Sequence, residues 1–181
     1  PVFSTSNFSG SIQLSKPKKI PVSVLVVMYN PAGKFLLIER ADKPDYWQSV
    51  TGSLDAWDEA PLQAAVRELL EETGFKVNAD PSLGLNDLTD EQLRQPHVLR
   101  PWPHSVQYEI FEHWRHRYGD GVTHNTEHWF AVCLPTGALP QLAEREHVGH
   151  AWLSASDAAR RCFSPNNAQA ILALHELLSA Q

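Results

Sequence analysis

The fold is decided by the stretch Gly52-Ser-Leu-Asp-Ala-Trp-Asp-Glu59-Ala-Pro-Leu-Gln-Ala-Ala-Val-Arg67-Glu68-Leu-Leu-Glu71-Glu72-Thr-Gly74-Phe75. Between residues 59 and 73, apolar side chains recur at the three- and four-residue spacing of an amphipathic helix. Asp58 is a candidate N-cap, and Pro61 suits the first turn, where a missing N–H is tolerated. Gly74 is expected to end the helix, because glycine readily adopts the left-handed conformation of a C-cap.

Three carboxylates share one face of this predicted helix. Glu68, Glu71 and Glu72 lie at positions i, i+3 and i+4. Like charges at such spacing cost about 0.2–0.5 kcal/mol per pair on an exposed helix. A hard divalent cation would remove the repulsion, since Mg²⁺ binds oxygen ligands and keeps waters that a phosphate can replace. Arg67, four residues before Glu71, can orient one carboxylate. A solvated acidic surface is the alternative for any helix with three glutamates.

The complete pattern resembles the Nudix box, Gly-x5-Glu-x7-Arg-Glu-U-x-Glu-Glu-x-Gly-U, in which U is an apolar residue. Gly52, Glu59 and Gly74 occupy further positions of the box, in addition to the arginine and the three glutamates. Six residues separate Gly52 from Glu59 where the consensus has five, and Trp57-Asp58 stands where a glycine is usual. The resemblance implies an α/β/α sandwich with a central mixed sheet. It also implies a pyrophosphohydrolase that uses Mg²⁺, with Mn²⁺ as a substitute.

The rest of the sequence predicts a mixed sheet with helices packed on it, an α/β or α+β fold. Residues 22–29 form a continuous β-branched run, typical of a strand covered on both faces. A turn at residues 30–33 joins it to a second strand at residues 35–40. Further elements are expected as strands at residues 47–50, 106–111, 127–134 and 148–153, and as a helix that starts at Ser164-Pro165 and runs through residue 178.

The length of 181 residues fits one domain. Residues 1–20 are interpreted as an N-terminal tail and residues 21–181 as a single Nudix hydrolase domain. Residues 82–103 form an apparent insertion, Pro-rich and irregular, with a short helix at residues 89–94.

Charge and composition exclude several classes of function. The chain carries 15 Lys and Arg against 21 Asp and Glu, a formal net charge of −6, which argues against a nucleic-acid partner. No apolar run reaches the roughly 18 residues of a membrane span, and no signal-peptide core is evident. Cys133 and Cys162 lie in apolar surroundings and are expected to be buried or half-buried free thiols. We therefore expect a cytoplasmic protein, of an oligomeric state that the sequence leaves open.

Segments outside the box narrow the resemblance to the bacterial dihydroneopterin triphosphate pyrophosphatases within the Nudix family. They are residues 21–27, 45–53, 111–118, 121–130 and 164–171. In that group Glu68 and Glu72 would ligate catalytic Mg²⁺, with Glu71 as an additional or alternating ligand. A further ligand comes from a Glu-His pair before the last strand, here Glu146-His147, and the role is assigned to Glu146. Either Glu146 or a box glutamate would be the general base.

Arginine and amide side chains outside the box are candidate substrate ligands. Arg115 and Arg117 lie in a polar segment, and their forked guanidinium groups match phosphate oxygens. Trp47 could stack on a heterocycle, although a tryptophan that begins a short strand is more often part of the core. The remaining candidates are Arg40, Gln48 and Asn125.

The leading hypothesis from the resemblance is hydrolysis of dihydroneopterin triphosphate to the monophosphate and pyrophosphate, a step of folate biosynthesis. One alternative is a pyrophosphatase of nucleoside triphosphates such as dATP. A second, of another class, is a non-catalytic Nudix domain that binds or regulates. Such domains lose box glutamates, and this chain retains them all. An RNA-processing Nudix protein is disfavoured by the acidic charge balance.

Overall fold

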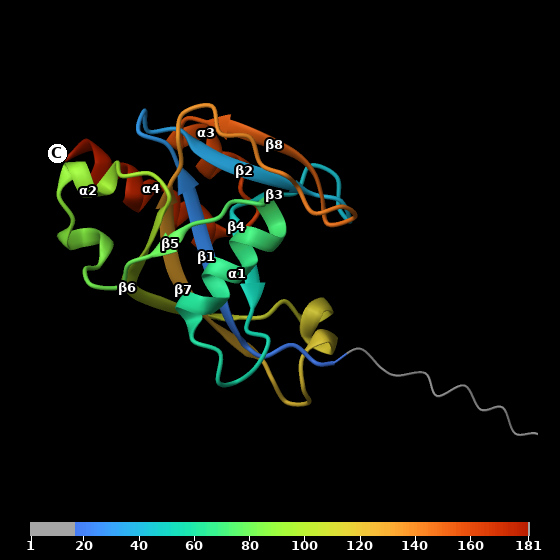
Figure 1. The fold of residues 1–181 in the computed structure, drawn as a ribbon. Helices are drawn as coiled ribbons and strands as arrows, with labels where there is room; N and C mark the ends of the chain where they lie inside the picture. Colours follow the sequence, from blue (N-terminus) through green and yellow to red (C-terminus); the bar gives the residue numbers. More distant parts are fainter. Residues whose placement is uncertain (1–16, 181) are drawn as a thin grey trace, which may run out of the picture.

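The computed structural model of the protein describes residues 17–180 (Figure 1). Residues 1–16, most of the expected tail, and residue 181 lie outside the described residues. The last part of the tail packs against a later segment of the chain. The backbone N–H of Lys19 donates to the Arg117 carbonyl at 2.8 Å, and the Lys18 ammonium donates to the His116 carbonyl at 3.0 Å.

One mixed sheet runs through the described residues, with the main strand order β3-β2-β1-β7-β6-β5; β4 pairs with β1, and β8 pairs with β2. Its strands are β1 (Val22–Tyr29), β2 (Phe35–Arg40), β3 (Trp47–Gln48), β4 (Val50–Ser53), β5 (Asn78–Ala79), β6 (Val98–Glu109), β7 (His124–Cys133) and β8 (His147–Leu153). The hairpin of β1 and β2 lies where the sequence predicts it. β1 is central and almost entirely buried, which confirms the expectation for its β-branched run.

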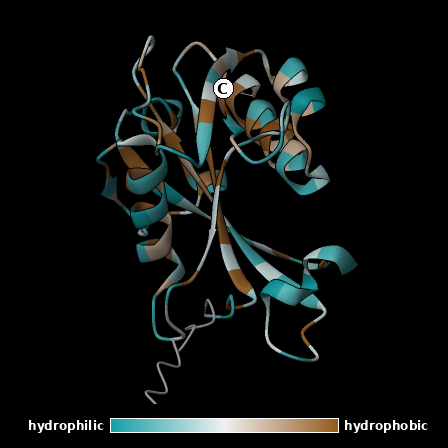
Figure 2. Cartoon of the chain, turned by 90° about the vertical axis from the view of Figure 1, so that its right-hand side faces the viewer, coloured by the Kyte–Doolittle hydropathy of each residue, from teal (hydrophilic) through white to brown (hydrophobic). Residues whose placement is uncertain are grey.

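Helices cover both faces of the sheet (Figure 1). They are α1 (Pro61–Thr73), α2 (Asp90–Leu93), α3 (Ala155–Arg161) and α4 (Pro165–Ser179), with short 3₁₀ segments η1 (Leu85–Asp87) and η2 (Glu112–Arg117). Leu69 of α1 packs with Val24 and Ile38 on one face, whereas Ile171 of α4 packs with Leu25 on the other. Figure 2 shows hydrophobic colouring along the central strands between the helix layers. The α/β/α sandwich is confirmed.

The sheet divides beside β1, and this division positions the site. β2 pairs with β1 only at Met28↔Leu36 and Tyr29↔Phe35, and it then pairs with β8 and β3. β4 takes the vacated side of β1, from Val26↔Val50 to Ser23↔Ser53. The end of β2 and the end of β4 therefore border an opening next to the N-terminal half of β1.

Helix α1 starts later than its hydrophobic pattern predicts, and Asp58 is not its N-cap. The N-cap is Ala60, whose extended backbone has ψ 139°. Because a residue before proline is disfavoured in the helical region, Pro61 fixes the first turn and excludes residues 59 and 60 from the helix. Gly74, at φ 74°, is the left-handed C-cap that the sequence predicts.

The segment treated as an insertion contributes to the sheet. It holds η1, the expected short helix α2 and the first residues of β6, which starts at Val98 rather than Val106. The sequence does not predict the first part of this strand, because Pro101 and Pro103 lack the N–H that a ladder uses. The ladder with β7 shifts register between Pro101 and Ser105. Helix α3 and strand β5 were not predicted. Across residues 17–180, no helix has the length and apolar character that crossing a bilayer requires.

Candidate active site

The three glutamates of α1 have different environments. Glu72 is 7% exposed and faces the sheet. The Glu68 side chain is 14% exposed, and that of Glu71 is 56% exposed. Helical geometry alone would place all three on one face, but the sheet buries only the two that project towards β4.

Arg67 organises the carboxylates around the start of α1. Its Nε and Nη2 atoms each donate to Glu59 at 2.9 Å, and its Nη1 donates to Glu68 at 2.8 Å and Glu71 at 3.3 Å. Asp55 pairs with the same guanidinium at 3.1 Å. Glu59 also accepts the Asp55 backbone N–H at 3.0 Å, so it anchors the loop rather than joining the other acidic groups. The predicted orienting role of Arg67 thus extends to four carboxylates.

Gly52 is required by the position of Glu68. A Cβ atom on Gly52 would lie 2.1 Å from Glu68 Cδ and 2.3 Å from its Oε1. Real carbon atoms in contact stay about 3.5–4.0 Å apart. The Glu68 carboxylate therefore rests directly on the β4 backbone, at a place that only glycine leaves free.

Glu72, Glu146 and His147 form a cluster with the composition of a metal site. One ligand atom from each lies within 4.8 Å of the others. Glu72 Oε2 and His147 Nδ1 are buried without a hydrogen-bond partner in the structure. A buried carboxylate oxygen without a donor is costly, and a divalent cation would satisfy it. The residues present therefore fit a divalent metal ion. His147 was not among the predicted ligands, although it is adjacent to Glu146 in the sequence.

The pKa shifts of the cluster residues are also consistent with a divalent metal ion. Burial, together with the negative charges of Glu68 and Glu146, raises the pKa of Glu72 to about 9. Burial also raises the pKa of Glu68, against the opposing effect of Arg67. Burial and the charge of Arg40 lower the pKa of His147, which favours the neutral imidazole that can bind a metal. The cluster of Glu72, Glu146 and His147 itself contains no Lys or Arg side chain.

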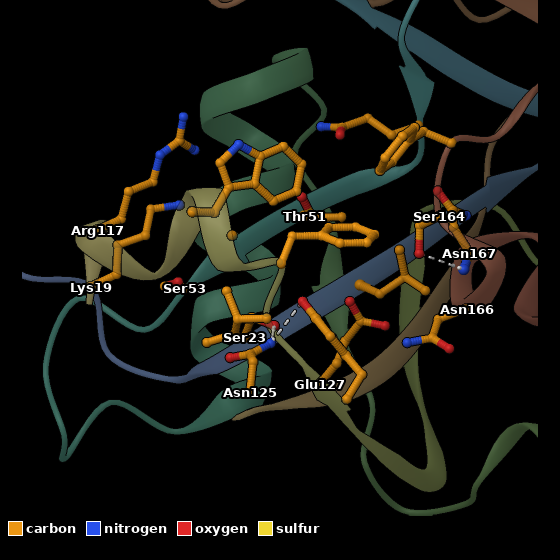
Figure 3. Close-up of a pocket in the computed structure, with 18 of the residues that line it drawn as sticks. Lys19, Ser23, Thr51, Ser53, Arg117, Asn125, Glu127, Ser164, Asn166 and Asn167 are labelled. Carbon is orange, nitrogen blue, oxygen red and sulfur yellow. Dashed lines mark hydrogen bonds between the residues drawn. The ribbon is translucent and has the colours of Figure 1, made fainter. Parts of the chain in front are cut away.

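A pocket of about 340 Å³ opens beside this cluster, on the α4 side of the sheet. Gly52 lines the pocket and contacts Glu68 from behind, so the pocket reaches the acidic helix through the division of the sheet. Figure 3 shows Lys19 and Arg117 at one side of the pocket and Asn125 and Glu127 at its floor. The volume is within the range of small-molecule sites.

Three cationic side chains border the end of the pocket near the acidic helix: Lys19, Arg40 and Arg117. Desolvation and the positive charges of Arg117 and Arg40 lower the pKa of Lys19. Arg40 forms a bidentate pair with Asp42 at 2.8 and 2.6 Å. Of the predicted candidates, Arg40, Gln48, Arg117 and Asn125 line the pocket. Arg115 does not, because it pairs with Glu109 and donates to the Ile110 carbonyl.

Of the adjacent aromatic residues Tyr46 and Trp47, Tyr46 lines the pocket and Trp47 does not. Trp47 is 9% exposed, packs in the core and lies under the Arg161 guanidinium at 5.2 Å. Alternation along the chain turns Tyr46 and Gln48 towards the pocket instead. The Tyr46 ring stacks on Phe163 at 4.1 Å between centroids.

Further aromatic rings complete the rim of the pocket. Phe163 lies 6.0 Å from Phe111 and 6.2 Å from Trp114, and Phe111 and Phe163 are exposed. Phe163 comes from the loop before α4, whereas Phe111 and Trp114 come from the N-cap and the first turn of η2, much earlier in the sequence. The rim therefore offers flat apolar surfaces to a ring system, as ligand pockets commonly do.

The chain belongs to the Nudix hydrolase family: the family model described as the NUDIX domain matches residues 19–174. It is 43% identical to the dihydroneopterin triphosphate diphosphatase of Escherichia coli (strain K12), over 86% of this chain and 93% of that one. The enzyme of the same name from Haemophilus influenzae is 37% identical, over 82% and 84% of the two chains. The solved structure of the E. coli dihydroneopterin triphosphate pyrophosphohydrolase superimposes with a TM-score of 0.69, at 41% identity, covering 86% and 95%.

Proposed function

We propose that this enzyme hydrolyses dihydroneopterin triphosphate to dihydroneopterin monophosphate and pyrophosphate with Mg²⁺. The observation that carries the chemistry is the buried, unpartnered Glu72 carboxylate beside Glu146 and His147, next to a pocket with a basic end. The substrate is proposed from the relatives, which carry the name of this activity at 37–43% identity over most of the chain.

Glu68, Glu72 and Glu146 would hold the metal, with His147 as a further donor and Glu71 as an exposed ligand recruited with substrate. Such an ion, when bound, polarises phosphoryl oxygens and lowers the pKa of a bound water. Mg²⁺ is the proposed ion because the donors are mainly carboxylate oxygens. Mn²⁺ would be a substitute.

Other residues of the chain bind the phosphates and accept the proton of the attacking water. Lys19, Arg40 and Arg117 bind the phosphate oxygens and offset their negative charge, which an acidic protein must do locally. Water adds across the bridging P–O–P bond, so one proton must leave the water as the bond breaks. Glu146, at the edge of the cluster, or a glutamate of α1 accepts that proton.

Arg67 acts through the acidic residues. It holds Glu68 and Glu71 in place and ties the loop carboxylates to α1. Residues that orient metal ligands in this way typically change metal affinity or activity by about 10- to 100-fold when they are removed.

A nucleoside triphosphate pyrophosphatase that acts on dATP is the main alternative, since it would use the same acidic helix. A non-catalytic Nudix domain is the alternative of another class. The retained Arg67 network and the buried Glu72 favour catalysis, because a binding domain has no use for an unpaired buried carboxylate.

The test is a pyrophosphate-release assay with Mg²⁺, comparing dihydroneopterin triphosphate, dATP, GTP and a dinucleoside polyphosphate at equal concentrations. We expect the highest kcat/KM for the pterin. Glu72→Gln should abolish turnover while substrate binding persists. A preference for a nucleotide would remove the pterin assignment. Absence of turnover with every substrate would favour the binding domain.

A further inference from the structure

The floor of the pocket is built from side chains of three adjacent strands: Ser23 of β1, Tyr108 of β6, and Asn125 and Glu127 of β7. Ser23 pairs with Glu127 across the parallel ladder, and Tyr108 pairs with Asn125 across the antiparallel one. Asn125 and Glu127 are two residues apart on a strand and so project to the same face. Figure 3 shows them together below the aromatic side chains.

Asn125 is held in one orientation. Its Nδ2 donates to Ser23 Oγ at 2.7 Å and to Tyr108 Oη at 3.0 Å, which uses both amide protons. Its Oδ1 is buried and has no partner in the structure. The floor therefore presents an unused acceptor beside the carboxylate of Glu127.

Glu127 is a buried carboxylate without a cationic partner among residues 17–180. It is 6% exposed and forms none of the ion pairs of that range. Its Oε1 accepts the Trp129 indole N–H at 2.9 Å. Burial raises the pKa of Glu127, because desolvation disfavours the ionised carboxylate, and the hydrogen bond from Trp129 opposes this only in part. The neutral hydrogen bond from Trp129 satisfies only one carboxylate oxygen.

The floor thus has acceptors in excess, and a ligand with adjacent N–H donors would complete it. β4, β1 and β7 are neighbours, so Glu127 lies two strand spacings, roughly 10 Å, from the β4 backbone at Gly52 and Ser53. That separation leaves room for a bicyclic ring between the floor and the phosphates at the acidic helix.

We propose that Glu127 is a specificity-determining residue that accepts hydrogen bonds from the ring N3–H and the 2-amino group of a reduced pterin. This inference rests on the proposed function and names the group that reads the ring. Guanine presents the same pair of adjacent donors. Adenine presents a ring nitrogen acceptor beside its amino group, so a carboxylate gains one hydrogen bond from it and opposes a lone pair. Asn125, positioned by Ser23 and Tyr108, supports Glu127 as the neighbouring acceptor.

A structural role for Glu127, in which it only holds Trp129, predicts a different result from the same substitution. In Glu127→Gln the amide oxygen can still accept the Trp129 N–H, so the core contact is kept. The second oxygen is replaced by an NH₂ group. This donor would face the N–H donors of the pterin, but it could donate to the ring nitrogen acceptor of adenine. Ring recognition would change, whereas packing would not.

The experiment compares wild-type protein, Glu127→Gln and Glu91→Gln on dihydroneopterin triphosphate, GTP and dATP. Glu91 is an exposed residue of α2 outside the pocket, so its variant controls for the loss of one charge. For each substrate, kcat/KM of the variant is compared with kcat/KM of the wild-type protein, because the sugar or side chain of a substrate also affects its rate of hydrolysis. We expect Glu127→Gln to lower kcat/KM for the pterin and GTP by about 10- to 100-fold, as for loss of a hydrogen bond to a charged group. The value for dATP should be unchanged or higher.

Calorimetric binding of dihydroneopterin monophosphate and dAMP, without metal, provides a readout independent of turnover. The variant should lose affinity for the pterin and keep or gain affinity for dAMP, with a melting temperature close to that of wild type. An unchanged pterin-to-dATP ratio, or equal losses for every substrate, would overturn the role of Glu127. Failure of the wild-type protein to hydrolyse the pterin at all would instead refute the proposed function.

Discussion

Gly52→Ala should remove activity while leaving the fold nearly intact. The new Cβ would lie 2.1 Å from Glu68 Cδ, where about 3.5 Å is the closest comfortable approach. The carboxylate must therefore move by roughly 1.4 Å, the difference between these distances. It is the end of a flexible side chain, so it moves more easily than the β4 backbone.

The two consequences differ in size. A displacement of about 1 Å at a catalytic group can reduce the rate about 100-fold. The effect on stability is small, because Gly52 has no left-handed backbone and alanine there gains about 0.4–1 kcal/mol through the unfolded state. Weakening of the Arg67–Glu68 pair opposes this gain by a similar amount. We expect the free energy of unfolding to change by less than about 1 kcal/mol.

The assay measures kcat/KM by pyrophosphate release, metal affinity by titration, and melting temperature for the same preparations. Gly33→Ala is the matched control, because Gly33 has φ +78° and a Cβ atom there would meet no other atom within 4 Å. It should lose about 1–2 kcal/mol of stability through backbone strain and keep its activity. Wild-type kcat/KM in Gly52→Ala would refute the placement of Glu68 against β4. A large fall in melting temperature would show that the backbone, not the side chain, gave way.

Three further predictions concern the pocket, the acidic cluster and the core. Arg117→Ala should raise KM for a triphosphate substrate about 10-fold or more, as expected for a charged hydrogen bond, whereas Arg115→Ala should change it little; similar KM values in the two variants would contradict this assignment. The raised pKa of Glu72 means that the folded, metal-free protein binds a proton which the unfolded chain releases above its ordinary value of 4.5, so stability should fall as pH rises from 4.5 to about 9. Thermal melts across that range test this, with Glu72→Gln expected to flatten the slope. Asn167→Ala should lower the free energy of unfolding by about 1–3 kcal/mol, because Asn167 Oδ1 accepts the buried Ser49 N–H at 2.8 Å, and denaturant titration measures the loss.

The parts of the site that sequence predicts are local in the chain. Periodicity places Glu68 and Glu72 on one turn of α1, and the glycine after Thr73 ends that helix. The sequence could not predict that Glu72 is buried and Glu71 exposed, because this difference depends on which side of the helix packs against β4.

The parts that sequence missed are set by long-range contacts or by the direction of one side chain. Lys19 reaches the pocket because its backbone pairs with Arg117, almost one hundred residues later in the chain. Tyr46 and Trp47 are adjacent aromatic residues, and only the pleat of the strand decides which one faces the core. The start of β6 was missed because two prolines lie within it.

The division of the sheet beside β1 separates the acidic helix from the pocket that lies on the other face. Glu68 and Glu72 stand on α1 on one face of the sheet, and the pocket is lined by residues of β7 and the N-terminal turn of α4 on the other. A residue such as Asn166 at the pocket can therefore be exchanged without displacing the hydrolytic machinery. This architecture makes the protein a suitable starting scaffold for libraries that retarget a fixed pyrophosphate-cleaving centre to new heterocycles.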